Sequence, residues 1–201
     1  MDAAVLIPVK DFRQAKARLA GVVPADDRVR LARWTADRVL AAAAPLPVFV
    51  ACDDTEVADW AEAAGATVLW RPGFGLNAAV ADGIATLAAA GIEHAIVAHS
   101  DLAVPSPLAS LVLSGAMVLV PDTRDDGTNV IAVPTTAGFE PAYGSQSFRR
   151  HLTQVLGLGR TVRVVRDANL ALDIDTPADL RHPLIARVLP SWLRTNLDNP
   201  Q

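Results

Sequence analysis

Short apolar segments and longer amphipathic segments alternate along the first half of the chain. Residues 5–9, 46–51 and 67–70 are apolar runs of strand length. Between them, apolar positions recur at helical spacing after Asp26 and Asp27, and again after Thr55. An order of strand, helix, strand, helix, strand is typical of a parallel sheet with right-handed crossovers. The pattern therefore predicts an α/β fold.

The second half continues this pattern. Strands are expected at residues 95–98, 117–120, 130–133 and 161–165. Helices are expected over residues 78–90 with Asn77 as N-cap, from Ser106-Pro107 to Gly115, and along an apolar stripe of Phe148, Leu152, Val155 and Leu156. We expect one domain over residues 1–190, a Rossmann-like three-layer sandwich around a mostly parallel central sheet. Residues 191–201 are expected to form a polar, frayed tail.

Composition narrows the class of protein. The 201 residues carry a formal net charge of −4, which gives no support for a nucleic-acid or membrane-surface partner. The single cysteine, Cys52, excludes an intrachain disulfide and fits a reducing compartment. The first residues lack a secretory signal pattern, and no apolar run approaches the roughly 20 residues of a membrane span. We therefore expect a soluble, cytoplasmic protein.

Asp101 lies where the apolar run 95–98 gives way to a loop that contains Pro105 and Pro107. In open α/β sheets, ligands bind beyond the carboxyl ends of the strands. A carboxylate at that place is well positioned to hold a metal ion. A structural role, as a helix cap or a turn hydrogen bond, fits the position of Asp101 equally well.

A second pair of carboxylates follows near the end of the chain. Asp173 and Asp175 are two residues apart in an extended segment, so their side chains project from the same face. Thr176, Pro177 and Asp179 then form a helix start, and Asp175 could belong to that cap. Asp173 instead interrupts an apolar run, where burial of a carboxylate is costly unless a metal compensates it. The pair is therefore a candidate metal site.

Two loops could bind a nucleotide. The loop after the first strand carries four cations, at Lys10, Arg13, Lys16 and Arg18, and could lie along a polyphosphate. A solvated charged surface explains the same residues. The glycine-containing loop over residues 71–77 lacks the Walker lysine and the dinucleotide spacing, so close approach to a base or ribose is its expected use if a ligand binds there.

Two further segments could contribute to an anion site. The acidic turn over residues 121–129 fits a plain hairpin loop or the surroundings of a metal. After Gly144, Ser145 or Ser147 can cap a helix whose first turn carries Arg149 and Arg150. Cations there oppose the helix dipole, so a bound anion is expected to compensate them. His151 fits either a packed histidine or a site residue.

Two separated acidic sites, a basic loop and an anion-ready helix together indicate metal-assisted phosphoryl or nucleotidyl transfer. A small number of oxygen ligands favours magnesium, because this ion retains water ligands and substrate phosphates complete its coordination shell. No serine–histidine or cysteine–histidine pairing competes as a nucleophilic site.

An ordered set of motifs over nearly the whole chain resembles the phospholactate/phosphoenolpyruvate guanylyltransferases of deazaflavin coenzyme biosynthesis. The set comprises residues 7–10 and 15–19, Gly75-Leu76-Asn77, Ser100-Asp101-Leu102, Gly127-Thr128-Asn129, residues 143–148 with His151, and residues 172–180. The resemblance is incomplete at Ala103, where the family usually has proline. A more flexible loop after Asp101 is therefore expected.

The resemblance implies a nucleotidyltransferase-like fold that transfers GMP from GTP to a three-carbon phosphorylated carboxylic acid and releases pyrophosphate. It implies Mg²⁺ on Asp101, Asp173 and Asp175, with Asp101, Asp173 and Lys16 as the catalytic set. By the same comparison, the nucleotide would be bound by Lys10, Lys16, Arg18, Gly75, Leu76 and Asn77. The acceptor would be bound by Thr128, Gly144 and Ser147, with Asn129 as a neighbour.

Phosphoenolpyruvate, 2-phospholactate and phosphoglycerate are the candidate acceptors, and all three carry a phosphate and a carboxylate. The alanine- and arginine-rich composition resembles that of a high-GC bacterium, and on this ground we expect phosphoenolpyruvate. Two alternatives remain at this point. One is another metal-dependent nucleotidyl- or glycosyltransferase of the same fold, and the other is a non-catalytic sensor of a nucleotide or phosphorylated acid. A sensor would need the anion site but not two groups of carboxylates.

Overall fold

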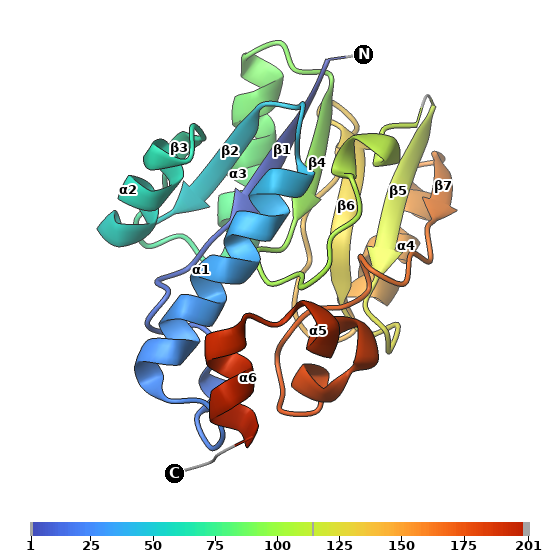
Figure 1. Ribbon diagram of the computed structural model, residues 1–201. Helices are drawn as coiled ribbons and strands as arrows, with labels where there is room; N and C mark the ends of the chain where they lie inside the picture. The colour runs from blue at the N-terminus through green and yellow to red at the C-terminus, as the bar shows by residue number, and fades with distance from the viewer. Residues whose placement is uncertain (1, 114, 199–201) are drawn as a thin grey trace.

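A computed structural model describes residues 2–113 and 115–198 and contains a seven-stranded sheet in the order β3-β2-β1-β4-β6-β5-β7 (Figure 1). The strands are β1 Ala3–Pro8, β2 Val48–Cys52, β3 Thr67–Trp70, β4 His94–Ala98, β5 Ala116–Pro121, β6 Thr128–Pro134 and β7 Thr161–Val164. Strand β6 runs antiparallel to both of its neighbours, β4 and β5. The remaining pairings are parallel, which confirms the predicted mostly parallel sheet.

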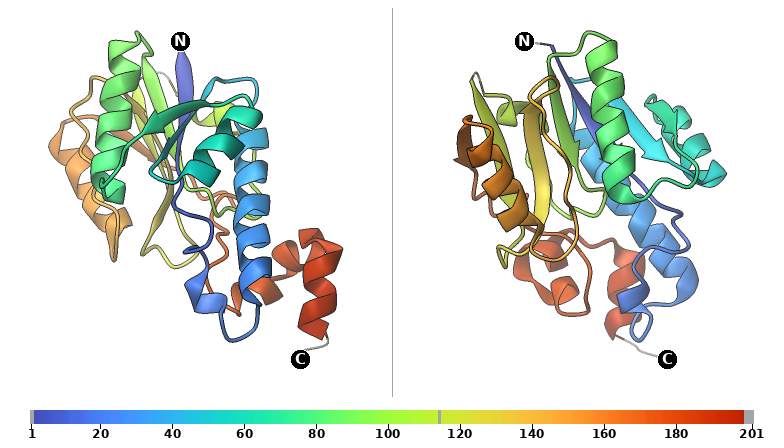
Figure 2. Two further views of the ribbon diagram at one scale, coloured as in Figure 1. Left: turned by 90° about the vertical axis from the view of Figure 1, so that its left-hand side faces the viewer. Right: turned by 180° about the vertical axis from the view of Figure 1, so that it is seen from behind.

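Helices cover both faces of the sheet (Figure 2). Helices α1 (Ala25–Ala42) and α2 (Thr55–Ala63) and the 3₁₀ turn η2 (Leu108–Leu111) pack on one face. Helices α3 (Leu76–Ala89) and α4 (Ser147–Gly157) pack on the other. The predicted helix from Ser106-Pro107 to Gly115 is wrong, because the described residues of this segment form only the short 3₁₀ turn.

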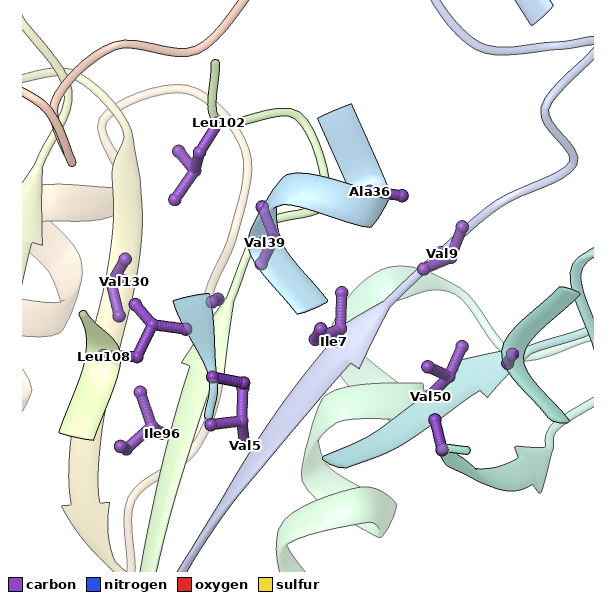
Figure 3. Packing of buried hydrophobic residues seen from close by; sticks show 14 of the residues in the cluster. Val5, Ile7, Val9, Ala36, Val39, Val50, Ile96, Leu102, Leu108 and Val130 are labelled. Carbon is purple, nitrogen blue, oxygen red and sulfur yellow. The ribbon is translucent and has the colours of Figure 1, made fainter. Parts of the chain in front are cut away.

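The two cores follow from strand periodicity, since alternate side chains of each strand point to opposite faces. Figure 3 shows Val5, Ile7, Val50, Ile96 and Val130 packed on one side with residues of α1 and η2. Their sequence neighbours, such as Leu6 and Val97, are equally buried on the α3 and α4 side. Burial on both faces explains why these strands read as continuous apolar runs.

Three helix details differ from the sequence-based prediction. Thr55 could have capped the helix that follows it in the sequence, but Asp54 caps α2, since its side chain accepts from the Val57 N–H. Helix α3 begins at Leu76 with Gly75 as N-cap, so Asn77 is not the cap. Leu156 does not belong to the buried stripe of α4, because it is 58% exposed.

The carboxyl ends of β1, β2 and β4 meet at the edge of the sheet below which the C-terminal helices lie (Figure 1). A third hydrophobic cluster, which includes Leu19, Leu172, Ile174 and Leu193, forms at this edge. Its C-terminal members lie on or near the 3₁₀ turn η3 (Asp179–Arg181) and helices α5 (Pro183–Val188) and α6 (Ser191–Asp198). The expected frayed tail is therefore wrong for residues 191–198, and its last residues, 199–201, lie outside the described part.

Within residues 2–113 and 115–198, every helix falls short of the length and apolar character that a membrane crossing would need.

Candidate active site

Three aspartates from two distant segments converge at this sheet edge. Asp101 follows β4, and Asp173 and Asp175 lie in an extended segment that runs antiparallel beside it through a bridge between Leu102 and Asp173. Two backbone hydrogen bonds hold the segments together: Ala103 N–H to the Leu172 carbonyl (3.1 Å) and Ile174 N–H to the Asp101 carbonyl (3.2 Å). One carboxylate oxygen from each aspartate lies within 4.8 Å of the others. The structure thus gathers the three predicted carboxylates into one cluster, while their role as metal ligands stays a prediction.

The cluster has the electrostatics of a cation site. Burial and the charges of Asp101 and Asp175 raise the pKa of Asp173 to about 7. Burial and Asp101 also raise the pKa of Asp175. Burial alone would raise the pKa of Asp101 too, but Lys16 and His99 hold it below its usual value. The buried Oδ1 of Asp101 has no hydrogen-bond partner among the described residues. A hard divalent cation would satisfy this oxygen and relieve the mutual repulsion, so the residues fit Mg²⁺.

Lys16 supplies the positive charge next to the cluster. Its Nζ lies 3.2 Å from Asp101 Oδ2 and 3.9 Å from Asp175 Oδ1, and it donates to the Ile174 carbonyl at 2.6 Å. The side chain is only 4% exposed. The backbone of Lys16 is left-handed, with φ of 58°, a conformation that costs a non-glycine residue energy and is found at functional sites. Arg18 is exposed and lies 3.6 Å from Asp175.

Two adjoining pockets extend from the cluster along the first loop. The inner pocket, of about 200 Å³, is lined by residues that include Lys16, His99, Asp101 and Asp175. The outer pocket, of about 300 Å³, lies at the ends of β2 and β3 and is lined by residues that include Gly75. Five residues line both pockets: Pro8, Val9, Lys10, Gln14 and Leu76. The predicted nucleotide residues Lys10, Lys16, Gly75 and Leu76 therefore border two adjoining pockets.

Asn77 does not line either pocket. Its Oδ1 accepts from the Tyr143 N–H at 2.7 Å, and its Nδ2 donates to the Tyr143 carbonyl at 3.4 Å. The side chain thus fastens the start of α3 to the loop before α4, and this contact explains Asn77 structurally.

A third pocket, of about 280 Å³, borders the other side of the carboxylate cluster. Its lining includes Thr123, Asp173, Asp179, Arg181 and His182. Asp101 and Asp175 face the inner pocket and Asp173 the third pocket, so the cluster stands between two spaces. The carboxylate cluster is thus bordered by two separate pockets.

The predicted acceptor residues form a buried polar group at the start of β6 and of α4. Thr128 Oγ1 lies 3.0 Å from His151 Nδ1 and accepts from Ser147 Oγ at 3.4 Å. Thr128 and Ser147 are each 2% exposed. Gly144, with φ of 115°, adopts a backbone conformation that L side chains rarely reach. The structure thus brings Thr128 and Ser147 together, and their contact with an acceptor stays a prediction.

Asn129 has a positioning role. Its Nδ2 donates to the Leu170 carbonyl at 3.0 Å, and its own carbonyl accepts from the His99 N–H at 3.1 Å. It therefore links the strand end before Asp101 to the segment before Asp173.

The backbone N–H groups at the start of α4 already bind another part of the protein. Asp126 accepts from Gln146 N–H through its carboxylate and from Phe148 N–H through its carbonyl. The Arg150 guanidinium donates to the carbonyls of Ala142 and Ser145. The expected bound anion is thus not needed to compensate Arg150. The acidic turn that the sequence left open is a structural turn, because the Asp122 carboxylate accepts from three of its backbone N–H groups.

His99 and Tyr143 are two residues of this region that the sequence did not identify as site residues. Their ring centroids lie 4.9 Å apart, and His99 Nε2 and the Tyr143 hydroxyl are buried with no hydrogen-bond partner in the described part of the chain. The two-residue spacing of His99 and Asp101 at a strand end is a signal that could have identified His99. Tyr143 carries no comparable signal, because only the fold brings its loop to β4.

His151 is a packed histidine with a defined protonation state. Its Nε2 accepts from the Ala142 N–H at 2.8 Å, so Nδ1 carries the proton toward Thr128. Burial, with the charges of Arg150 and His99, lowers the pKa of His151 to about 4 from an ordinary 6.5.

This shift predicts acid sensitivity. Between pH 6.5 and about 4 the unfolded chain binds a proton that the folded protein excludes, so stability falls as the pH decreases. The loss attributable to His151 is at most about 3 kcal/mol. His151→Gln keeps one donor and one acceptor but does not titrate. Urea unfolding of both proteins at pH 7.5 and 4.5 should show a smaller pH effect for the variant; equal effects would contradict the assignment.

The parallel strands, the crossover helices and the carboxylate cluster at the strand ends define a nucleotidyltransferase-type α/β protein. Solved structures confirm the fold. A putative nucleotide-diphospho-sugar transferase from Desulfovibrio desulfuricans G20 superposes with a TM-score of 0.75 at 15% identity, covering 98% of this chain and 94% of that one. A nucleotidyl transferase from Methanothermobacter gives 0.66 at 17% identity, covering 96% and 99%.

Residues 3–186 match the family model described as "Guanylyl transferase CofC like", and the chain belongs to this family of guanylyltransferases. A phosphoenolpyruvate guanylyltransferase from Sphaerobacter thermophilus is 35% identical over 190 residues, covering 90% of this chain and 91% of that protein. The Streptomyces coelicolor protein of the same name is 33% identical over 205 residues, covering 94% and 93%. A 3-phospho-D-glycerate guanylyltransferase from Phenylobacterium zucineum is 33% identical over 190 residues, covering 88% and 87%.

Proposed function

We propose that this guanylyltransferase transfers GMP from GTP to phosphoenolpyruvate, with Mg²⁺ and with release of pyrophosphate, in cytoplasmic biosynthesis of the deazaflavin coenzyme. The observation that carries the proposal is the carboxylate cluster between the inner and third pockets. Such an arrangement suits attack of an acceptor phosphate on the α-phosphorus of a nucleotide across a shared cation. The names of the relatives from Sphaerobacter and Streptomyces support phosphoenolpyruvate as acceptor.

Each part of the site has a task in this reaction. Asp101, Asp173 and Asp175 would hold Mg²⁺, whose charge would offset the negative charge on the oxygens of the transferred phosphoryl group. Lys16 holds Asp101 and Asp175 in place and presents an ammonium group to the inner pocket. Lys10 and Arg18 add positive charge for the departing pyrophosphate, and Gly75 and Leu76 border the nucleoside.

On the acceptor side, Thr128, Gly144 and Ser147 line none of the three pockets, so binding of the phosphorylated acid by Thr128 and Ser147 would require these buried side chains to become exposed. Asn129 would position the neighbouring segments and not contact the acid, because its side-chain amide already donates a hydrogen bond to the Leu170 carbonyl. Arg181 and His182, which line the third pocket, provide further polar groups for the three-carbon acid.

The test is pyrophosphate release from GTP and Mg²⁺ in the presence of phosphoenolpyruvate, 2-phospho-L-lactate or 3-phospho-D-glycerate, with the product identified by mass spectrometry. We expect turnover with phosphoenolpyruvate and weaker turnover with at least one other acid. Turnover only with 2-phospholactate or 3-phosphoglycerate would replace the acceptor and keep the reaction. Nucleotide binding without turnover of any acid by folded protein would favour the sensor.

A further inference from the structure

The outer pocket contains one carboxylate that the fold does not use. Asp53 is exposed at the end of β2, and no hydrogen bond or ion pair of its carboxylate occurs within residues 2–113 and 115–198. Two other charged side chains of this pocket, Asp11 and Arg71, are engaged by neighbouring residues. Asp11 accepts from Arg13 at 3.0 Å and from Gln14 at 3.3 Å, and Arg71 donates to Asp82 and Thr86. Asp53 is therefore the acidic group in this pocket that is free to receive a ligand.

An aromatic ring lines the same pocket. Phe74 is 45% exposed in the loop between β3 and α3, where Gly73 takes a positive φ of 75°. Phenyl rings are usually buried in the core of a protein, so an exposed ring in a pocket is unusual. Such a ring offers a flat apolar surface to a planar ligand. Aromatic side chains and nucleobases stack with a gain of about 1–3 kcal/mol per base.

The two pockets adjoin along five shared residues, and their different linings indicate which end of a nucleotide each would receive. The inner pocket contains the carboxylate cluster and Lys16, so a triphosphate with its cation belongs there. Lys10 lines both pockets and stands at the junction. The base of a nucleotide whose phosphates occupy the inner pocket then reaches the outer pocket, with Asp53 and Phe74.

Guanine is the base that a lone carboxylate selects. Its Watson–Crick edge presents two adjacent donors, N1–H and the N2 amino group, and a carboxylate accepts both at once. Adenine and cytosine place an acceptor beside their amino group, and uracil flanks its single N–H with two carbonyls. Each of these bases would therefore put a lone pair against the carboxylate, which only accepts hydrogen bonds.

We propose that Asp53 reads the guanine base through a bidentate hydrogen bond while the ring of Phe74 stacks on it, which makes Asp53 the residue that selects GTP. This inference rests on the proposed function, since it places GTP across the two pockets. It assigns to Asp53 a role in base selection that the carboxylate cluster and Lys16 do not perform.

The test changes the hydrogen-bonding groups of residue 53 and of the base together. Asp53→Asn presents one acceptor and one donor, which fits xanthine with its N1–H and C2 carbonyl but not guanine. We expect the kcat/KM for GTP to fall ~100-fold and that for XTP to rise, so that the variant prefers XTP. Dissociation constants of both nucleotides, measured by equilibrium dialysis with Mg²⁺, should invert in the same way. An unaltered preference for GTP, or equal loss of both nucleotides at an unchanged melting temperature, would overturn the proposal.

Two further measurements separate base reading from other effects. Asp11→Asn removes a charge from the same pocket, at a carboxylate that Arg13 already engages, and should still prefer GTP over XTP. ITP lacks the N2 amino group, so the wild-type protein should prefer GTP to ITP, whereas Asp53→Ala should bind the two alike. Persistent discrimination in Asp53→Ala would refute the contact. Failure of the wild-type protein to bind GTP would instead contradict the proposed function.

Discussion

Asp173→Asn is expected to lower the kcat of guanylyl transfer by ~1000-fold, because the loss of one of three carboxylates removes several kcal/mol of cation-mediated stabilisation of the transition state. The same change should stabilise the protein without metal. The folded-state pKa of Asp173, about 7, lies above its ordinary value of 3.8, so the ionised carboxylate destabilises the fold at high pH. At pH 8 in EDTA, the melting temperature of Asp173→Asn should exceed that of the wild-type protein by about 2–4 °C for each kcal/mol of unfolding free energy gained. This difference should vanish near pH 4. Saturating Mg²⁺ should stabilise the wild-type protein more than the variant.

Asp167→Asn provides the matched control. Asp167 lies in the same segment, and its Oδ1 accepts from the backbone N–H groups of Asn169 and Leu170. Asparagine retains such an oxygen, so this variant should keep most of its turnover. Near-wild-type kcat in Asp173→Asn, or equal losses in both variants, would reject a metal-binding role for Asp173.

Lys16→Met is expected to reduce the kcat/KM for GTP by ~100-fold, because the side chain places a charge at the wall between the inner pocket and the cluster. Stability without metal should fall by about 2 kcal/mol, since Asp101 and Asp175 lose the ammonium between them. In the absence of nucleotide, the variant should bind Mn²⁺ ~10-fold more tightly, a difference of about 1.4 kcal/mol, because no ammonium competes for the same oxygens. Electron paramagnetic resonance of free Mn²⁺ during titration measures this affinity.

Arg13→Met is the control for Lys16, since Arg13 is in the same loop but is exposed and pairs with Asp11 and Asp54. It should change neither Mn²⁺ affinity nor melting temperature appreciably. Unchanged or weaker Mn²⁺ binding by Lys16→Met would show that the ammonium does not occupy part of the cation site.

Sequence patterns predicted the parts of the site that depend on local periodicity. Asp173 was identifiable because a carboxylate in an apolar run needs compensation, and Asp101 because it ends a doubly buried strand. The antiparallel bridge between Leu102 and Asp173 was not predictable, because it joins segments about seventy residues apart through backbone groups that carry no sequence signal.

Contacts made by backbone carbonyls were missed for the same reason. In the sequence, the positive charge of Arg150 at a helix start has no evident compensation. In the structure, the carbonyls of Ala142 and Ser145 accept hydrogen bonds from its guanidinium. Asn77 looked like a helix cap and instead binds the backbone of Tyr143. In both cases the partner is main chain from a neighbouring loop, whose position only the folded structure determines.

The alternation along residues 172–175 has a practical consequence for handling the protein. Asp173 and Asp175 belong to the carboxylate cluster, while Leu172 and Ile174 share a hydrophobic cluster with Leu193 of α6. Shortening the polypeptide before residue 191, or attaching a purification tag that strains α6, would loosen the anchor beneath those aspartates. The start of β1 lies at the opposite edge of the sheet, so an affinity handle belongs at the amino terminus (Figure 1).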